Sequence, residues 1–322
     1  MTLFALAAAA LVAANAPGAA RAPRAPDPVL SPIRLAPDVY MVQGDLGVAS
    51  PANQGFNSNA AWVVTRDGVV VIDALGTPAL GRALVRAIRS TTRRPIRRVV
   101  LTHEHADHAY GLAALKAAGA EVWARAEGRE YLESDEAKAR LAQRRRDLAP
   151  WFGTDDGLLV PDRWITKDGP LVLGGKRFEL VHLGPAHSPE DLMIVLPDEG
   201  VVFSGDVIFE GRVPFVGEAD SKGWLAAIDR LLAARPRLLV SGHGPASRDP
   251  AAALGLTRDY LVYLRKVMGA AVQDLVPFDE AYAAADWSPF SRLPAFDQAN
   301  RINAYGTYLT LEREMLEAAR GR

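Results

Sequence analysis

Four potential metal ligands lie within six residues of one short segment. Residues 101–108 read LTHEHADH and follow an apolar run (RRVVL) that is typical of a buried strand. In an extended strand end, His103 and His105 point to the same side, because side chains alternate with a period of two. Asp107 and His108 come where the chain turns into the next helix. Burying four such polar groups without partners would be costly, and metal coordination offsets that cost. The segment therefore favours a fold that presents a metal site at the carboxyl end of a strand.

Three more candidate ligands follow strand-like runs in the same way. His187 comes after a strand-like run and Gly-Pro, Asp206 ends VVFSGD, and His243 ends LLVSGH. Any one of these alone is best explained as an ordinary residue at a strand end, but five of the six histidines share this placement. His182 is the exception, because it lies within a predicted strand, and we expect it to be structural or to support a ligand from behind.

The chain has no cysteine among its 322 residues. This excludes disulfides, cysteine-type zinc fingers, thiolate-held iron–sulfur clusters and cysteine nucleophiles, and leaves His, Asp and Glu as ligands. The formal net charge is −1, so no overall field favours nucleic acid or an anionic membrane. We expect a small-molecule substrate and no nucleic-acid partner.

The order HxHxDH, a single His, an Asp and a final His resembles the metallo-β-lactamase-fold superfamily over roughly residues 38–250. The resemblance implies an α+β fold, the αββα sandwich, in which two mixed β-sheets pack face to face with helices on the outer faces. The order of strands and helices read from the sequence agrees with sheets packed together and covered by helices. The resemblance also implies the metal ligands. One metal would be held by His103, His105 and His187, another by Asp107, His108 and His243, and Asp206 would bridge both. Asp73 of VVVID would orient one of the ligands by a hydrogen bond.

By this resemblance the chain is a glyoxalase II-like hydrolase with two zinc ions, although iron or manganese could replace zinc. A water shared by the metals attacks the carbonyl of a thioester, ester or lactone, and Asp107 also orients that water and moves its proton. The segments GDVIFEGR, SGHGP and NAYGTYLTLE look like the quinoprotein relay system zinc metallohydrolases. That narrower resemblance implies a partner in a periplasmic quinoprotein system.

Three other functions stay open. The first is β-lactam cleavage, although the β-lactamases with a cysteine ligand need a thiolate where Asp206 stands. The second is an iron-dependent oxidoreductase like the persulfide dioxygenases, with His103, His187 and Asp206 as two histidines and one carboxylate on a single iron. The third is a non-catalytic accessory protein of quinoprotein metabolism.

The residues that would contact a substrate are less well marked. We expect them in the loop 51–57, in Phe209–Phe215 just after Asp206, and in a charged helical insertion near 125–165. Asp191, four residues after His187, either orients a ligand or shapes its own turn. The Arg144–Arg146 cluster is expected on a solvated face. The substrate-binding candidates are Trp151 and Phe152 of the insertion, and Asn303 and Tyr305 if the last helix packs back.

The N-terminus predicts export. Residues 3–14 form an apolar run of 12 residues, which is too short to span a membrane and has the length of a signal-peptide core. We therefore expect a signal peptide at 1–20, a Pro-rich linker at 21–37 and a hydrolase domain at 38–322. The mature protein would be periplasmic or secreted, without a stable membrane anchor.

Overall fold

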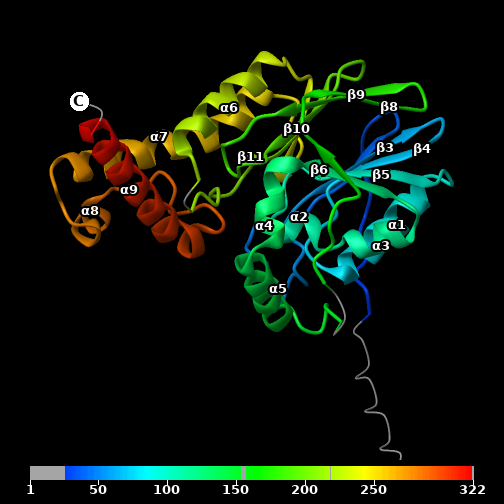
Figure 1. The fold of residues 1–322 in the computed structure, drawn as a ribbon, viewed down its shortest axis with the longest axis horizontal. Coiled ribbons are helices and arrows are strands. Elements are labelled where there is room, and N and C mark those ends of the chain that lie inside the picture. Colours follow the sequence, from blue (N-terminus) through cyan, green and yellow to red (C-terminus); the bar gives the residue numbers. More distant parts are fainter. Residues whose placement is uncertain (1–25, 154–156, 218, 321–322) are drawn as a thin grey trace, which may run out of the picture.

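Two β-sheets packed face to face form the centre of the computed structural model, which describes residues 26–153, 157–217 and 219–320 (Figure 1). The predicted signal peptide lies outside these residues. The first sheet has seven strands, antiparallel from β1 to β4 and parallel from β4 to β7. In spatial order they are β1 (Ile33–Ala36), β2 (Val39–Val42), β3 (Ala60–Thr65), β4 (Gly68–Ile72), β5 (Ile96–Val100), β6 (Glu121–Arg125) and β7 (Arg163–Ile165).

The second sheet has five strands, of which only β11 and β12 are parallel neighbours. Strand β9 is two antiparallel steps from β11, so β9, β11 and β12 all run in one direction and their carboxyl ends meet at the same edge. In spatial order the strands are β12 (Leu238–His243), β11 (Val201–Phe209), β10 (Leu192–Leu196), β9 (Lys176–His182) and β8 (Gly169–Leu173).

Strand β4 shows why the layers stack as they do. Its sequence GVVVI is buried at every position. Val70 and Ile72 belong to the core between the two sheets, whereas Val69 and Val71 belong to the core under the helices on the other face. Full burial of one such side chain stabilises the fold by about 1.5–3 kcal/mol, so a strand that is apolar on both faces favours the middle of a layered fold.

Helices cover the outer face of each sheet, which confirms the predicted αββα sandwich. Helix α1 (Pro78–Thr91) and the short α2 (Ala106–Ala109) and α3 (Leu112–Ala117) pack on the first sheet. The Thr77 hydroxyl caps α1 by accepting from the backbone N–H of Leu80 at 3.1 Å. Helix α6 (Ser221–Ala233) and the long α7 (Pro250–Gln273) pack on the second sheet.

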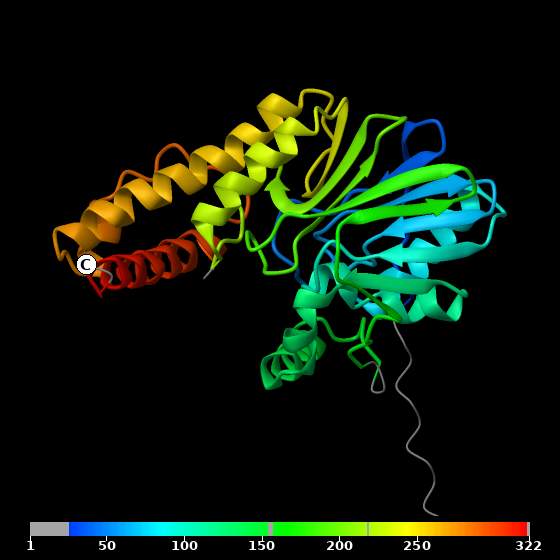
Figure 2. The same ribbon diagram turned by 45° about the horizontal axis from the view of Figure 1, so that its top comes forward.

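The predicted insertion is a helical crossover between β6 and β7. It contains a short 3₁₀ turn (Ala126–Gly128), α4 (Arg129–Glu133) and α5 (Asp135–Asp147), and it ends before β7, which rejoins the sheet. Beyond the sheets, α7 lies beside α9 (Phe296–Arg320), and α8 (Phe278–Ala284) connects them at the far end (Figure 2). No helix among the described residues is long and apolar enough to span a membrane.

The predicted linker at 21–37 is wrong over its second half. Residues Ile33–Ala36 form the edge strand β1, and Leu30 is buried in the core under α1. The Asp27 carboxylate pairs with the guanidinium groups of Arg82 and Arg86 on α1. Proline disfavours helix but is compatible with an edge position, so this Pro-rich stretch joins the fold as extended chain.

Candidate metal centre

The seven predicted ligands meet at one edge of the sandwich, where strands of both sheets end. His103 and His105 follow β5, and Asp107 and His108 lie in α2. His187 lies in the loop after β9. Asp206 lies inside β11, just after Gly205, and His243 is the last residue of β12. Gly205 has φ +52°, and a Cβ there would lie 2.6 Å from the Thr102 Cβ, so a glycine is needed where β11 passes the His103 loop.

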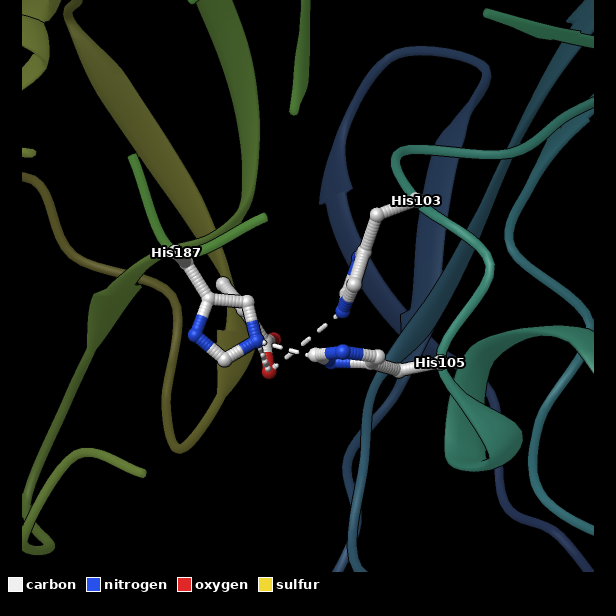
Figure 3. Close-up of side chains that lie close together, drawn as sticks. His103, His105 and His187 are labelled. Carbon is white, nitrogen blue, oxygen red and sulfur yellow. Dashed lines mark hydrogen bonds and ion pairs between the residues drawn. The ribbon is translucent and has the colours of Figure 1, made fainter. Parts of the chain in front are cut away.

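The first group of ligands contains three histidines and Asp206. The rings of His103, His105 and His187 point toward one another, with His187 reaching across from the second sheet (Figure 3). The His187 Nε2 lies 2.9 Å from the His105 Nδ1, and the His103 and His105 ring centroids are 4.6 Å apart. One donor atom from each of the four residues fits within 4.8 Å of the others.

The second group contains Asp107, His108 and His243, whose donor atoms also lie within 4.8 Å of one another. The His243 Nε2 lies 3.5 Å from the Asp107 Oδ2. The Asn57 side-chain amide donates to that same Asp107 oxygen at 2.9 Å. Asn57 is part of the 51–57 loop that the sequence marked for substrate contact, and here it holds a candidate ligand.

Asp206 lies between the two groups. Its Oδ2 is 3.7 Å from the His103 Nε2 and 3.4 Å from the His187 Nε2 in the first group. The same oxygen is 3.2 Å from the His243 Nε2, and the Asp206 Oδ1 is 3.1 Å from the His108 Nε2 in the second group. One carboxylate therefore faces ligands of both groups.

The outward nitrogens of three histidines are held by fixed partners. The His103 Nδ1 lies 3.0 Å from the Thr102 hydroxyl, and the His243 Nδ1 lies 2.5 Å from the Asn57 carbonyl. The His108 Nδ1 lies 2.9 Å from the Asp73 Oδ2, and Asp73 is the residue that the resemblance implied would orient a ligand. Such partners fix the tautomer and leave Nε2 free to face inward.

The charges of the site follow from burial and from the contacts between histidines and carboxylates. Burial lowers the pKa of His187 to about 3, so this ring is neutral at pH 7. Burial also opposes a charge on His108, but the carboxylates of Asp206 and Asp73 overcome it and raise the pKa of His108 well above its usual value. Burial would raise the pKa of Asp206, yet His243 and His108 hold it well below its usual value.

These residues fit divalent metal ions. The His103 Nε2 is buried without a hydrogen-bond partner among the described residues, and the buried His108 Nε2 and Asp206 Oδ1 have only each other, 3.1 Å apart. A buried polar atom without a partner is costly, and a metal ion would satisfy all three. The donors are nitrogen and oxygen only, a set that suits zinc and also iron or manganese.

Two nearby residues that the sequence singled out have structural contacts. The buried Asp191 carboxylate accepts from the backbone N–H and the hydroxyl of Ser188, both at 2.8 Å, so it shapes the turn after His187 and bonds to no candidate ligand among the described residues. The His182 Nε2 lies 2.8 Å from the carbonyl of Pro189 in the same turn. Both therefore support the loop that carries His187.

A cavity of about 210 Å³ opens in front of the two groups. All three predicted segments contribute to it: the loop 51–57 through Asn57, the helical insertion, and the residues after Asp206. Trp151 and Phe152 do not line it, so the prediction that they bind substrate is wrong. Phe152 packs instead against Tyr110, with ring centroids 6.2 Å apart, behind the cavity wall. The residues that line the cavity without belonging to the ligand groups are Val48, Ala49, Asn57, Ala106, Tyr131, Glu136, Arg140, Arg144, Phe209, Arg212 and Phe215.

The last helix does not bring Asn303 and Tyr305 to this cavity, which corrects their predicted role. Helix α9 packs along α7, and Asn303 is buried at that junction. Its carbonyl oxygen accepts from the backbone N–H of Val216 at 2.7 Å, and its amide donates to the Pro214 carbonyl at 2.7 Å. Asn303 thus anchors the loop that carries Phe215, whereas Tyr305 is exposed beside Phe278.

The sequence missed the arginines of the cavity. Arg144 was expected on a solvated face, and Arg212 was not singled out. Two signals were available: Arg140 and Arg144 are spaced by four residues and so share a helix face, and Arg212 follows Asp206 by six residues. The helix face alone does not say whether it meets solvent or a cavity.

Comparisons with known proteins agree with this geometry. The family model "Metallo-beta-lactamase superfamily" matches residues 53–243. The chain is 34% identical over 118 residues to hydroxyacylglutathione hydrolase GloC of Haemophilus influenzae, covering 36% of this chain and 51% of that protein. It is 24% identical to metallo-beta-lactamase IND-1 of Chryseobacterium indologenes, covering 66% of this chain and 80% of that protein.

Among solved structures, the sec-alkylsulfatase Pisa1 from Pseudomonas sp. superposes with a TM-score of 0.67 at 22% identity, covering 87% of this chain and 50% of that one. At this identity the likeness concerns the fold. The chain spans about half the length of GloC and of Pisa1. The family model covers more than half of the chain and includes all seven candidate ligands, so the chain belongs to the metallo-beta-lactamase superfamily.

Proposed function

We propose that the protein is a hydrolase that uses two zinc ions to cleave a thioester, an ester or a lactone. The observation that carries this proposal is the position of Asp206, whose carboxylate faces histidines of both ligand groups at 3.1–3.7 Å. A carboxylate shared between two complete groups favours two metals over one. The first metal would be held by His103, His105, His187 and Asp206, and the second by Asp107, His108, His243 and Asp206.

Zinc ions at these positions would supply a water with a pKa lowered to about 7 and a positive charge for the developing oxyanion. Asp107 lines the cavity, and Asn57 fixes its Oδ2. Burial would raise the pKa of Asp107, but His108 and His243 hold it well below its usual value, so the carboxylate is ionised. Asp107 would therefore orient the attacking water by accepting its hydrogen bond, in addition to serving as a ligand.

The relatives support hydrolysis of a carbonyl substrate. GloC is named a hydroxyacylglutathione hydrolase and IND-1 a metallo-beta-lactamase, and this chain is similar to both. A thioester or a related ester is our first choice because the identity to GloC is the higher, at 34%. Cleavage of a β-lactam is the second candidate, since the chain covers 80% of IND-1.

A single-iron oxidoreductase is disfavoured by the second ligand group. Two histidines and one carboxylate are enough for one iron. A single-iron site of this kind would not use Asp107, His108 and His243, which lie together, buried or half-buried. Asn57 nevertheless fixes Asp107, and Asp73 fixes His108. A quinoprotein partner and export to the periplasm stay predictions from the sequence, and the relatives named above lend them no support.

Metal quantitation followed by a substrate panel tests the proposal. The purified protein is stripped, reloaded with zinc and analysed for metal per chain, and then assayed on a thioester, a lactone, an aryl ester and nitrocefin. We expect two zinc ions per chain and turnover of a thioester, ester or lactone within about 1–10³ s⁻¹. One iron per chain with oxygen uptake on a persulfide, and no hydrolysis, would contradict the proposal.

A further inference from the structure

Three arginines line the cavity in front of the ligand groups. Arg140 and Arg144 come from α5, and Arg212 comes from the turn after β11. The carboxylates of Asp107 and Asp206 face the metal positions, which leaves Glu136 as the only other acidic residue among the described residues of the lining. The three arginines balance the three carboxylates of the lining, and two divalent ions at the metal positions would give the cavity an excess of positive charge.

Arg212 is a buried cation that makes no ion pair within the described residues, although the carboxylates of Asp107, Asp206 and Asp45 act on its charge from a longer distance. Its side chain is 3% exposed, and its Nη1 donates to the Gly47 carbonyl at 2.9 Å. The same nitrogen lies 3.5 Å from the His243 Nδ1, and Cζ lies 5.8 Å from the Phe209 ring centroid. No carboxylate among the described residues lies within ion-pair distance of it. Buried charges are normally paired, so an unpaired guanidinium beside an open cavity indicates an anionic ligand.

Helix α5 presents a matching face on the opposite side of the cavity. Glu136, Arg140 and Arg144 are each four residues apart, so they share one side of the helix. Arg140 is exposed at the rim, and Arg144 is half-buried deeper in the wall. Arg144 acts on the charge of Asp107 across this space. No ion pair involves Arg140 or Arg144 in the part of the chain that the structure describes.

We propose that Arg212 and Arg144, with Arg140 at the rim, bind a carboxylate of the substrate, so that the enzyme selects anionic esters, thioesters or lactones. The guanidinium fork matches a carboxylate in a bidentate geometry, which a lysine does not. Arg212 lies beside His243 of the second ligand group. A substrate carboxylate bound by Arg212 would therefore lie a few bonds from the carbonyl that is cleaved at the metals. The inference rests on the proposed function only for the reaction, since the three arginines line the cavity whether or not the protein turns over a substrate.

The size of the cavity limits the substrate. Its volume of about 210 Å³ is below the roughly 300–1,000 Å³ of pockets that enclose drug-sized ligands. A compact acyl group with its carboxylate fits such a space, and a longer substrate would extend past the rim at Arg140.

Binding of a non-hydrolysable anion tests the arginines without using activity. We would titrate 1-butanesulfonate, a weak metal ligand, into the zinc-loaded protein by calorimetry, with butan-1-ol as the neutral counterpart. The Kd for the sulfonate should rise at least about tenfold in Arg212→Gln and in Arg144→Gln, which corresponds to about 1.4 kcal/mol. Arg146→Gln is the matched control on the same helix, because Arg146 is exposed and does not line the cavity, and its Kd should equal that of the wild type.

Equal Kd values in the wild type, Arg212→Gln and Arg144→Gln would overturn the inference, and so would equal affinities for the sulfonate and the alcohol. Because Arg212 is buried, Arg212→Gln could fail to fold, and Arg212→Lys provides a second variant. Arg212→Lys keeps the positive charge and removes the bidentate guanidinium group. It should retain part of the affinity. Arg144→Gln changes a half-buried residue on a surface helix and decides the question if Arg212→Gln does not fold.

A kinetic arm separates this inference from the proposed function. Mono-4-nitrophenyl succinate and 4-nitrophenyl acetate share a leaving group and differ in a carboxylate. The wild type should favour the succinate in kcat/KM, and the preference should fall in Arg212→Gln through KM. Hydrolysis of both esters at equal kcat/KM would overturn the anion site while leaving the hydrolase intact. Hydrolysis of 4-nitrophenyl sulfate that depends on Arg212 would overturn the carboxylate assignment, because the anion would then be the cleaved group itself. Sulfonate binding that depends on the arginines, without turnover of any ester, would support the anion site and count against the proposed reaction.

Discussion

Replacing Asp73 with Asn should weaken the second metal position more than the first. The Asp73 Oδ2 accepts from the His108 Nδ1 at 2.9 Å and from the Thr102 hydroxyl at 2.8 Å, and Oδ1 accepts from the Thr102 backbone N–H at 2.8 Å. Asp73 has φ +61°, a conformation that Asn tolerates as well as Asp. The substitution therefore changes the charge and one acceptor without straining the backbone.

The size of the effect follows from the geometry of the amide. If the Asn nitrogen faces His108, two donors oppose each other or the ring changes tautomer and its Nε2 becomes protonated. If the nitrogen faces Thr102, the backbone N–H there is left unpaired. Losing the partner of a ligating histidine typically costs 10–100-fold in metal affinity, or about 1.4–2.7 kcal/mol. We expect this loss for the Asp107, His108 and His243 group, and a smaller one for the first group, because Asp73 reaches His103 only through the Thr102 hydroxyl.

Zinc titration against a chromophoric chelator measures the two affinities separately. Asp191→Asn is the matched control, because Asp191 is also a buried carboxylate, and among the described residues its side chain accepts hydrogen bonds from Ser188 alone. Burial, despite the two Ser188 hydrogen bonds, raises the pKa of Asp191 well above its usual value, so burial opposes a charge on this carboxyl group. Equal weakening of both metals in Asp73→Asn, or the same weakening in Asp191→Asn, would refute the assignment of His108 to a separate second position.

Three further predictions concern pH, a glycine and the anchor of the substrate loop. Because the pKa of His108 is raised, this ring is protonated without metal at neutral pH and must lose a proton when metal binds. The zinc affinity of the second group should therefore rise about tenfold per pH unit between about pH 6 and the pKa of His108, while the affinity of the first group changes little. Zinc titrations at several pH values would measure both. A Cβ at Gly242 would lie 1.9 Å from the Asp206 Oδ1, so Gly242→Ala should displace that carboxylate, destabilise the fold by about 1–3 kcal/mol and reduce bound zinc, and unchanged metal content would count against the position of Asp206. Asn303→Ala should cost about 3 kcal/mol by leaving buried backbone groups of the 214–217 loop unpaired; thermal unfolding and KM together would detect it, and a normal Tm would contradict the anchoring role.

The metal ligands could be predicted from sequence because their positions depend on local rules. A strand that is apolar at every position is buried, and the residues just after it must emerge at the edge of the sheet. HEHADH follows the apolar, buried end of β5 at Val99 and Val100, and SGH ends β12, which is buried at every position, so the ligands could be placed before the fold was known. Asp73, which follows β4, was instead proposed from the resemblance to the superfamily.

The cavity wall could not be predicted in the same way, because it depends on how distant segments pack. Trp151 suggested a substrate contact by its chemistry, but the loop after α5 turns it away from the cavity, and Arg144 on α5 faces inward instead. Similarly, a C-terminal helix can pack along its neighbour or fold back over the site. The pairing of α7 with α9 decides this for Asn303, and no local pattern in the sequence specifies that pairing.

The central claim is that Asp206 is shared by two metal ions, and zinc stoichiometry in Asp206→Asn tests it most directly. The wild-type protein and the variant would be reloaded under the same conditions and measured by mass spectrometry of the metal, with circular dichroism to establish that the variant is folded. The account predicts two zinc ions per chain in the wild type, and one or fewer in the folded variant, with loss of hydrolysis. Wild-type metal content and activity in Asp206→Asn would contradict the shared site.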